Sequence, residues 1–289
     1  MFIMSNSIIL LFTMNIFCTF MQIEVTADNS SIPIVIWHGM GRYHVNILLL
    51  LQIHRYKLMI YYDNSYFGNI NDDVKQVCEE IKMDKNLQNG YNAIGFSQGA
   101  QFLRAVAERC STPPMLNLIS FGGQHQGVYG LPRCIAVDHI ICEYIREALT
   151  YGAYVKFVQE KLIQAGYWHD PTKVDEYKRY SLFLADINNE LNINETYRNN
   201  LKNLESLVLV MFENDTMVQP KESEWFGFYK PGQNKEVESL QESSLYKEDR
   251  LGLREMDNLN KIHFLSVKGN HLKFTEEWFM ENIVDKFLK

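Results

Sequence analysis

The 289-residue sequence lacks any concentration of positive charge and contains few residues that break regular structure. Its 28 Lys and Arg residues stand against 35 Asp and Glu, which gives a formal net charge of −7, and no long Lys/Arg cluster occurs. Nucleic acid is therefore not expected as a partner, because phosphate binding needs concentrated positive charge. With 7 prolines and 16 glycines the chain is not of low complexity. The 46% hydrophobic and 13% aromatic residues favour a compact core over a disordered or fibrous chain.

The sequence also lacks a hydrophobic run long enough to cross a bilayer. Residues 8–21 are mostly apolar, but they fall short of the roughly 20 residues that a transmembrane helix needs. Followed by Val25-Thr26-Ala27, they predict a secretory signal peptide at residues 1–27. No Lys or Arg precedes Arg42, so an uncleaved anchor or an internal start is the alternative. For residues 28–289 we expect one domain without stable membrane insertion.

Cysteines are few, 5 in all, and none has the spacing of a zinc site. Cys18 lies in the expected signal peptide, which leaves an even set of four for an oxidising compartment. Four cysteines allow three pairings. Their positions favour Cys78–Cys110, near helices that border the central motif described below, and Cys134–Cys142, which flank a short segment.

Three Asn-x-Ser/Thr sequences support passage through the secretory pathway, and we expect glycosylation at Asn29, Asn194 and Asn214. They weaken the alternative that the four cysteines are free buried thiols of a cytosolic protein. No metal and no cofactor is expected.

Short apolar runs alternate with longer amphipathic ones, which predicts an α/β fold with a mainly parallel central sheet and flanking helices. Strands are expected at residues 32–37, 91–95, 116–121, 206–212 and 263–267. Apolar residues recur at helical spacing around 74–81 and 98–110. Residues 131–200 hold several helical patterns and no convincing strand, so we interpret them as a helical insertion over the sheet. The polar stretch 230–256 is expected to be an irregular surface excursion.

The central motif is Gly95-Phe96-Ser97-Gln98-Gly99, a G-x-S-x-G sequence between an expected strand and an expected helix. This context is the one that the nucleophile elbow of an α/β-hydrolase requires. The serine sits on a strained turn that projects its Oγ above the sheet, and the glycines remove side chains where strand and helix approach each other. We therefore predict that Ser97 is a catalytic nucleophile.

A serine hydroxyl is a weak nucleophile until a histidine takes its proton and a carboxylate orients that histidine. In α/β-hydrolases the acid and then the histidine follow the serine, on loops after later strands. Asp215 and His271 occupy such positions. Glu213 is a rival acid and His263 a rival base, although the start of a strand places His263 at the wrong edge of a parallel sheet.

The oxyanion hole is expected to use the backbone N–H of Gln98 and an amide from the loop after the first strand. His38-Gly39-Met40-Gly41 forms that loop, with Met40 as the second donor. An ordinary glycine-rich turn is the alternative interpretation of these four residues.

From Gly90 to the C-terminus, the sequence closely resembles the lysosomal palmitoyl-protein thioesterases of type 1. The segments that carry the resemblance are GFSQGAQFLRAVAERC, PPMLNLISFGGQHQGVYGLPRC, YWHDP, SLFLADIN, SEWFGFY and LYKEDRLGLREMDN, with IPIVIWHGMG upstream. The resemblance implies an α/β-hydrolase without a cofactor. It assigns the triad to Ser97, Asp215 and His271, the oxyanion amides to Met40 and Gln98, and disulfides to Cys78–Cys110 and Cys134–Cys142.

The resemblance also implies an activity, the removal of long-chain fatty acyl groups, mainly palmitate, from cysteine thioesters during lysosomal protein breakdown. The implied partners are S-palmitoylated proteins or peptides, fatty acyl thioesters, and a lysosomal sorting receptor that binds glycans at Asn194 and Asn214. The residue pattern by itself does not separate thioesters from oxygen esters, so a lipase or carboxylesterase is the alternative. The helical insertion is the expected wall of an acyl groove. Trp168, Phe183 and Trp225 are candidate contributors, although each by itself is more typical of a packed core.

One stretch departs from the family pattern. Between Gly41 and Asp63 the chain is shorter and lacks the Asp-Ser-Cys-Cys that usually follows the HGMG turn. A truncated helix, a lost sheet strand or a misassembled gene model would each explain this, and Met40 could then be misplaced. A catalytically impaired, lipid-binding homologue is therefore a further alternative.

Overall fold

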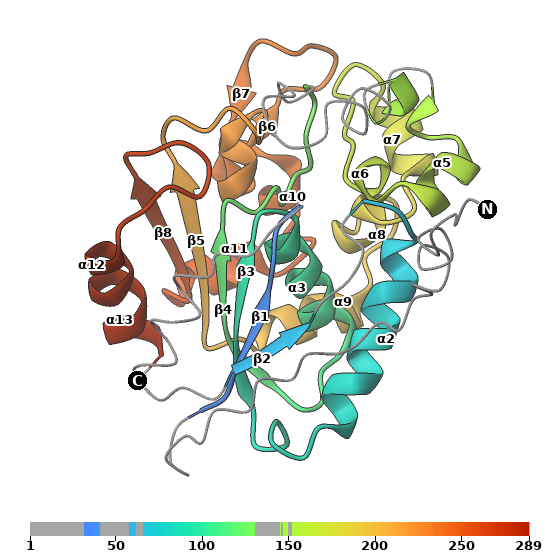
Figure 1. The fold of residues 1–289 in the computed structure, drawn as a ribbon. Coiled ribbons are helices and arrows are strands. Elements are labelled where there is room, and N and C mark those ends of the chain that lie inside the picture. Colours follow the sequence, from blue (N-terminus) through green and yellow to red (C-terminus); the bar gives the residue numbers. More distant parts are fainter. Residues whose placement is uncertain are drawn as a thin grey trace, which may run out of the picture.

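The computed structural model describes residues 32–40, 58–61, 66–130, 145, 147–149 and 152–288, and in them one six-stranded sheet forms the centre (Figure 1). Its strands are β1 (Ile34–Trp37), β2 (Leu58–Tyr61), β3 (Tyr91–Phe96), β4 (Met115–Phe121), β5 (Ser206–Phe212) and β8 (Ile262–Val267). They lie in the order β2-β1-β3-β4-β5-β8, and all neighbouring strands are parallel. The predicted parallel α/β architecture is confirmed.

Both faces of the sheet are buried, which explains why β1 is apolar throughout. Val35 and Trp37 point into the core on one face, whereas Ile34 and Ile36 point into a second core on the other. A strand that is buried on both faces has a continuous apolar sequence and not an alternation of apolar and polar residues.

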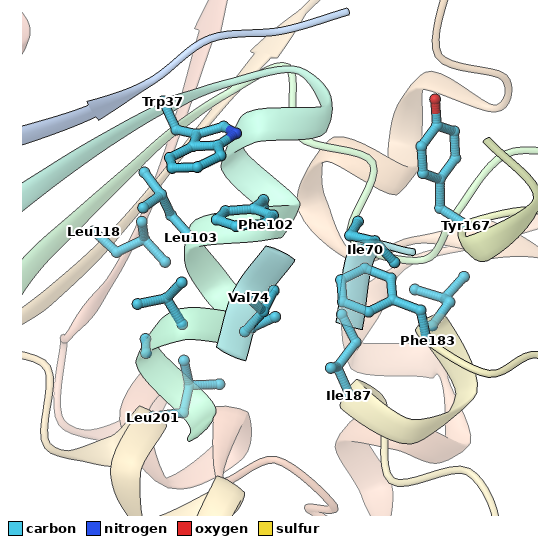
Figure 2. Packing of buried hydrophobic residues seen from close by; sticks show 14 of the residues in the cluster. Trp37, Ile70, Val74, Phe102, Leu103, Leu118, Tyr167, Phe183, Ile187 and Leu201 are labelled. Atoms are coloured by element: carbon cyan, nitrogen blue, oxygen red, sulfur yellow. The ribbon is translucent and has the colours of Figure 1, made fainter. Parts of the chain in front are cut away.

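Helices cover the two faces. The first core contains apolar residues of α2 (Ile70–Met83) and α3 (Gln98–Arg109), and Figure 2 shows Phe102 and Leu103 of α3 below Trp37. The second core is closed by the C-terminal helices α12 (Glu276–Phe279), η3 (Met280–Val284) and α13 (Asp285–Phe287). In the part of the chain described, no helix has the length and apolar character needed to cross a membrane.

The described part of residues 131–200 contains short helices joined by turns and no strand, although Leu162 and Trp168 form isolated bridges with Phe67 and Val128. Its helices are α5 (Lys156–Lys161), α6 (Ile163–Gly166), α7 (Val174–Tyr180), α8 (Leu184–Ile187) and α9 (Glu195–Lys202). Phe183 and Ile187 are fully buried in the first core, near Ile70 of α2 (Figure 2). Residues of this region therefore extend the core beyond the sheet.

The prediction that residues 230–256 form an irregular surface excursion is wrong. This part of the chain contains β7 (Val237–Glu238), which pairs with β6 (Phe228–Tyr229), and then η2 (Leu240–Glu242), α10 (Ser244–Lys247) and α11 (Leu253–Asn258). Five apolar residues within it are buried in the first core: Leu240, Leu245, Leu251, Leu253 and Met256. They are spaced singly among charged residues, so they form no run that predicts burial.

The shortened segment 41–63 raised the alternative that a sheet strand is lost. The structure has a strand there, β2, which pairs with β1 from Ile34↔Leu58 to Trp37↔Tyr61. Several predictions fall outside the described residues, namely the signal peptide, Asn29, the stretches 41–57 and 62–65, and the pairing Cys134–Cys142.

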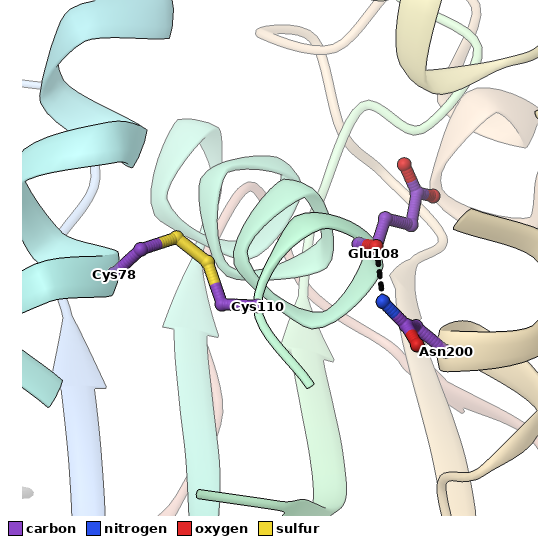
Figure 3. The surroundings of a disulfide bond; sticks show 4 residues. All are labelled: Cys78, Glu108, Cys110 and Asn200. Atoms are coloured by element: carbon purple, nitrogen blue, oxygen red, sulfur yellow. Dashed lines mark hydrogen bonds between the residues drawn. A yellow bond between two sulfur atoms is a disulfide. The ribbon is translucent and has the colours of Figure 1, made fainter. Parts of the chain in front are cut away.

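A disulfide joins Cys78 of α2 to Cys110, the residue after α3, with their Cα atoms 5.7 Å apart (Figure 3). This is one of the two pairings expected from the sequence. On the other side of α3, Asn200 of α9 donates a hydrogen bond from Nδ2 to the Glu108 carbonyl oxygen at 2.8 Å. The C-terminal end of α3 is thus held from both sides.

Arg104, in the middle of α3, has a fully buried side chain and links three parts of the chain. It donates hydrogen bonds to Glu108 Oε1 at 2.8 Å, to the Ile187 carbonyl at 2.9 Å, to Asn188 Oδ1 at 2.8 Å and to the His125 carbonyl at 3.1 Å. Burial raises the pKa of Glu108 to about 7, although Arg104 opposes this rise.

Replacing Arg104 with methionine is expected to lower the free energy of unfolding by about 3–5 kcal/mol, because buried acceptors lose their charged donor. Chemical denaturation measures this loss. The matched control is Arg109→Met on the same helix, which removes a partly exposed ion pair with Asp186 and a hydrogen bond to Asn71 and should cost only about 1–2 kcal/mol. Equal losses in the two variants would contradict the role given to Arg104.

Candidate active site

Ser97 lies on the tight connection between β3 and α3, immediately after Phe96 and before Gln98. Its backbone adopts φ 52° and ψ −124°, a conformation that non-glycine residues rarely take. Such a conformation costs about 1–3 kcal/mol and persists only where its surroundings enforce it. Here the Ser97 N–H donates to the Phe121 carbonyl of β4 at 2.7 Å, and the turn projects the side chain from the carboxyl end of β3.

The flanking glycines are required by close backbone contacts. A Cβ on Gly95 would lie 2.6 Å from the Ala100 nitrogen, and a Cβ on Gly99 would lie 2.6 Å from the Trp37 carbonyl oxygen. Any side chain at either position would push β3, α3 or β1 apart. The G-x-S-x-G sequence is thus explained by packing around the turn.

His271 and Asp215 reach Ser97 from the loops after β8 and β5. His271 Nε2 lies 2.9 Å from Ser97 Oγ, and His271 Nδ1 forms a hydrogen bond with Asp215 Oδ2. The second carboxylate oxygen, Asp215 Oδ1, accepts from the backbone N–H groups of Met217 at 2.6 Å and Val218 at 3.0 Å. The structure therefore brings the three predicted residues into one hydrogen-bonded series.

The charge of Asp215 is stabilised within this series. Burial by itself raises the pKa of the carboxyl, but the neighbouring side chains of His271 and Glu224 outweigh it, and the pKa falls below its ordinary value. An ionised Asp215 accepts the Nδ1–H of His271, which leaves Nε2 as an acceptor for the hydroxyl proton of Ser97.

The rival residues have other contacts. His263 packs its ring against Phe287 with ring centroids 4.8 Å apart, at the start of β8 and away from the strand ends that hold Ser97. Glu213 accepts a hydrogen bond from Ser266 Oγ at 2.9 Å. In the described residues it is Asp215, and not Glu213, that contacts His271.

The predicted oxyanion donors flank the serine. Gln98 begins α3, and a Cβ on Gly39 would lie 3.1 Å from Ser97 Cβ, which places the backbone before Met40 against the nucleophile. Residues after α5 contact both side chains: Tyr167 donates from its hydroxyl to Gln98 Oε1 at 3.2 Å, and Gln164 Nε2 lies 3.3 Å from Met40 Sδ. Neither Tyr167 nor Gln164 was predicted from the sequence.

Of the three aromatic candidates for an acyl groove, Trp168 and Phe183 lie in the packed core and Trp225 packs partly buried against it. Phe183 is fully buried and Trp168 is 8% exposed, both in the first core. Trp225 donates from its indole nitrogen to the Leu209 carbonyl at 3.0 Å and packs edge-on against Phe264.

Glu224, in η1 (Lys221–Trp225), is a further site residue that sequence reasoning missed. Its side chain is buried, and its Oε2 accepts the backbone N–H of Phe212 at 2.9 Å. One side-chain atom each of Asp215, Glu224 and His271 lies within 4.8 Å of the others, a spacing that a metal ion could also occupy. Because the oxygens of Asp215 already accept three hydrogen bonds, we interpret the group as an acid–base series.

The parallel sheet, the elbow at Ser97 and the histidine and carboxylate on later strand ends define the α/β-hydrolase class. Within it, residues 33–271 match the family model described as palmitoyl protein thioesterase. The chain belongs to the palmitoyl-protein thioesterase family, as the resemblance in its sequence predicted.

Three relatives illustrate this membership. The chain is 48% identical to palmitoyl-protein thioesterase 1 of Caenorhabditis elegans, over 91% of this chain and 94% of the relative. It is 38% identical to palmitoyl-protein thioesterase 3 of Dictyostelium discoideum, over 72% and 70% of the two chains. Lysosomal thioesterase PPT2-B of Xenopus laevis is 31% identical over 78% of this chain and 79% of its own.

Proposed function

We propose that the protein is a serine thioesterase that removes long-chain fatty acyl groups, mainly palmitoyl, from cysteine thioesters of proteins or peptides. The observation that carries this proposal is the hydrogen-bonded series Ser97–His271–Asp215 in a chain of the palmitoyl-protein thioesterase family. The family names the substrate class, and the series provides a nucleophile, a base and an orienting acid.

In the first half of the proposed reaction, His271 Nε2 takes the proton of Ser97 Oγ as that oxygen attacks the thioester carbonyl. The resulting oxyanion is stabilised by the backbone N–H groups of Gln98 and Met40. When the tetrahedral intermediate collapses, the C–S bond breaks and the cysteine thiolate takes the proton from His271. The fatty acid remains on Ser97 as an oxygen ester.

In the second half, His271 takes a proton from water, which attacks the acyl ester. The second tetrahedral intermediate expels Ser97 Oγ, which recovers its proton from His271, and the fatty acid leaves. Asp215 stays ionised throughout and stabilises the imidazolium that forms in each half.

We further propose a lysosomal location reached through the secretory pathway. A relative from Xenopus laevis carries the name lysosomal thioesterase, and Asn194 and Asn214 are exposed, as glycan acceptors must be. Glycans on these two residues would be the features that a lysosomal sorting receptor binds.

The substrate class is tested by comparing kcat/KM for a palmitoyl thioester and an oxygen ester of otherwise identical structure. We expect the thioester to be hydrolysed at least about tenfold faster, because a thiolate leaves with less help from the imidazolium acid. Faster hydrolysis of the oxygen ester would indicate a lipase or carboxylesterase. Palmitate binding without turnover of either substrate would indicate a catalytically impaired homologue.

A further inference from the structure

Glu224 places a second carboxyl group behind the proposed triad. It is fully buried, and the side chain of Asp215 is also closed to solvent. Carboxyl oxygens of the two residues lie within 4.8 Å of each other and of a nitrogen of His271. Glu224 Oε2 accepts the Phe212 N–H, whereas Glu224 Oε1 is buried and meets no N–H or O–H donor from the residues that the structure describes.

Two carboxylates this close in a buried site do not both ionise, because like charges and the loss of water each disfavour the second negative charge. Asp215 is the carboxyl group that ionises more readily, since it accepts hydrogen bonds from two backbone N–H groups and from His271. Glu224 accepts from one backbone N–H. Burial, followed by the close approach and the charge of Asp215, raises the pKa of Glu224 far above its ordinary range, and Glu222 adds to the rise.

We propose that Glu224 is a positioning residue whose neutral carboxylic acid donates a hydrogen bond from Oε1 to Asp215 and thereby holds that carboxylate toward His271. The proposal rests on the proposed function only for its effect on turnover. Among the described residues Glu224 Oε1 is buried without a hydrogen-bond donor, and a proton on this oxygen, donated to the neighbouring Asp215 carboxylate, accounts for that.

A neutral Glu224 also limits the negative charge beside His271 to one. An ionised Glu224 would add a second negative charge beside His271 and favour the imidazolium form, which cannot act as a base. Among the described residues, Asp215, His271 and Glu222 are the titratable side chains that face Glu224.

The kinetic test compares Glu224→Gln with Glu224→Leu. Glutamine keeps an oxygen for the Phe212 N–H and a donor for Asp215, so we expect kcat within about threefold of the wild type. The acidic limb of the pH profile, where kcat/KM falls as the pH is lowered, should be unchanged. Leucine removes the donor, and kcat should fall at least about tenfold with little change in KM. A downward shift of the acidic limb by about one pH unit or more in Glu224→Gln, or full turnover in Glu224→Leu, would overturn the proposal.

Glu222→Gln is the matched control for these kinetics. It removes a carboxyl two residues away that lies outside the hydrogen-bonded series, and it should leave kcat and the acidic limb unchanged. A loss of turnover equal to that of Glu224→Leu would mean that the segment, and not the donor, is what matters.

A second measurement is independent of turnover and of the fold of the leucine variant. The folded-state pKa of Glu224 is raised, so above the unfolded value of about 4.3 the unfolded chain releases a proton that the folded chain keeps. The unfolding equilibrium constant of the wild type, divided by that of Glu224→Gln, should therefore rise about tenfold per pH unit between pH 5 and 8. A ratio that does not change with pH would show that Glu224 is ionised in the folded chain, and it would overturn the proposal even if the enzyme is active. A ratio that rises with pH would support the proposal even if the enzyme is inactive.

Discussion

Replacing Ser97 with alanine is expected to lower kcat for a palmitoyl thioester by about 10⁵-fold or more, with the fold unchanged. Alanine leaves no atom that can form the acyl bond, and residual hydrolysis would rest on binding and the oxyanion amides alone. The Ser97 side chain makes no capping hydrogen bond to α3, so the substitution removes no hydrogen bond that stabilises the helix. Steady-state release of palmitate measures the loss, and thermal unfolding checks the fold.

Ser266→Ala is the matched control, because it removes an exposed hydroxyl whose hydrogen bond goes to Glu213. This variant should keep wild-type turnover. Substantial palmitate release by Ser97→Ala would contradict the assignment of Ser97 as the nucleophile.

Replacing Asp215 with asparagine is expected to lower kcat by about 10³–10⁴-fold. Asparagine has one acceptor oxygen, and the Met217 and Val218 N–H groups that now bind Asp215 Oδ1 would hold it in place. Its NH₂ group then faces His271 Nδ1, so the imidazole proton moves to Nε2. In that tautomer Nε2 can no longer accept the proton of Ser97.

The rate on the palmitoyl thioester between pH 5 and 8 measures this effect. Glu213→Gln tests the rival acid in the same assay and should stay within about threefold of the wild type. Near-normal turnover in Asp215→Asn together with a large loss in Glu213→Gln would reverse the assignment of the acid.

Features with a local signature could be predicted from the sequence. The strand 206–212 is correct to the residue, and the strand at 116–121 is one residue too short, because buried parallel strands form continuous apolar runs. The positions of Ser97, Asp215 and His271 follow from the ends of such strands, since the carboxyl ends of parallel strands share one edge of the sheet. The same reasoning set His263 aside, and the structure places it at the start of β8.

Features that depend on contacts distant in sequence could not be predicted. Glu224 is one acidic residue among several in a polar stretch, and only the folded chain places it behind Asp215. Tyr167 meets Gln98 across 69 positions of the chain, and Gln164 meets Met40 across 124. In residues 230–256, single apolar residues between charges are buried because separate short helices, and the turn before α11, each contribute one or two of them.

The most direct test of the account is to look for the covalent intermediate. The protein is mixed with a palmitoyl thioester, quenched in acid during turnover and analysed by mass spectrometry after proteolysis. We expect one palmitoyl group as an oxygen ester on Ser97, absent from Ser97→Ala. Palmitate released at the wild-type rate with no acyl group on Ser97, or with the group on another residue, would contradict it.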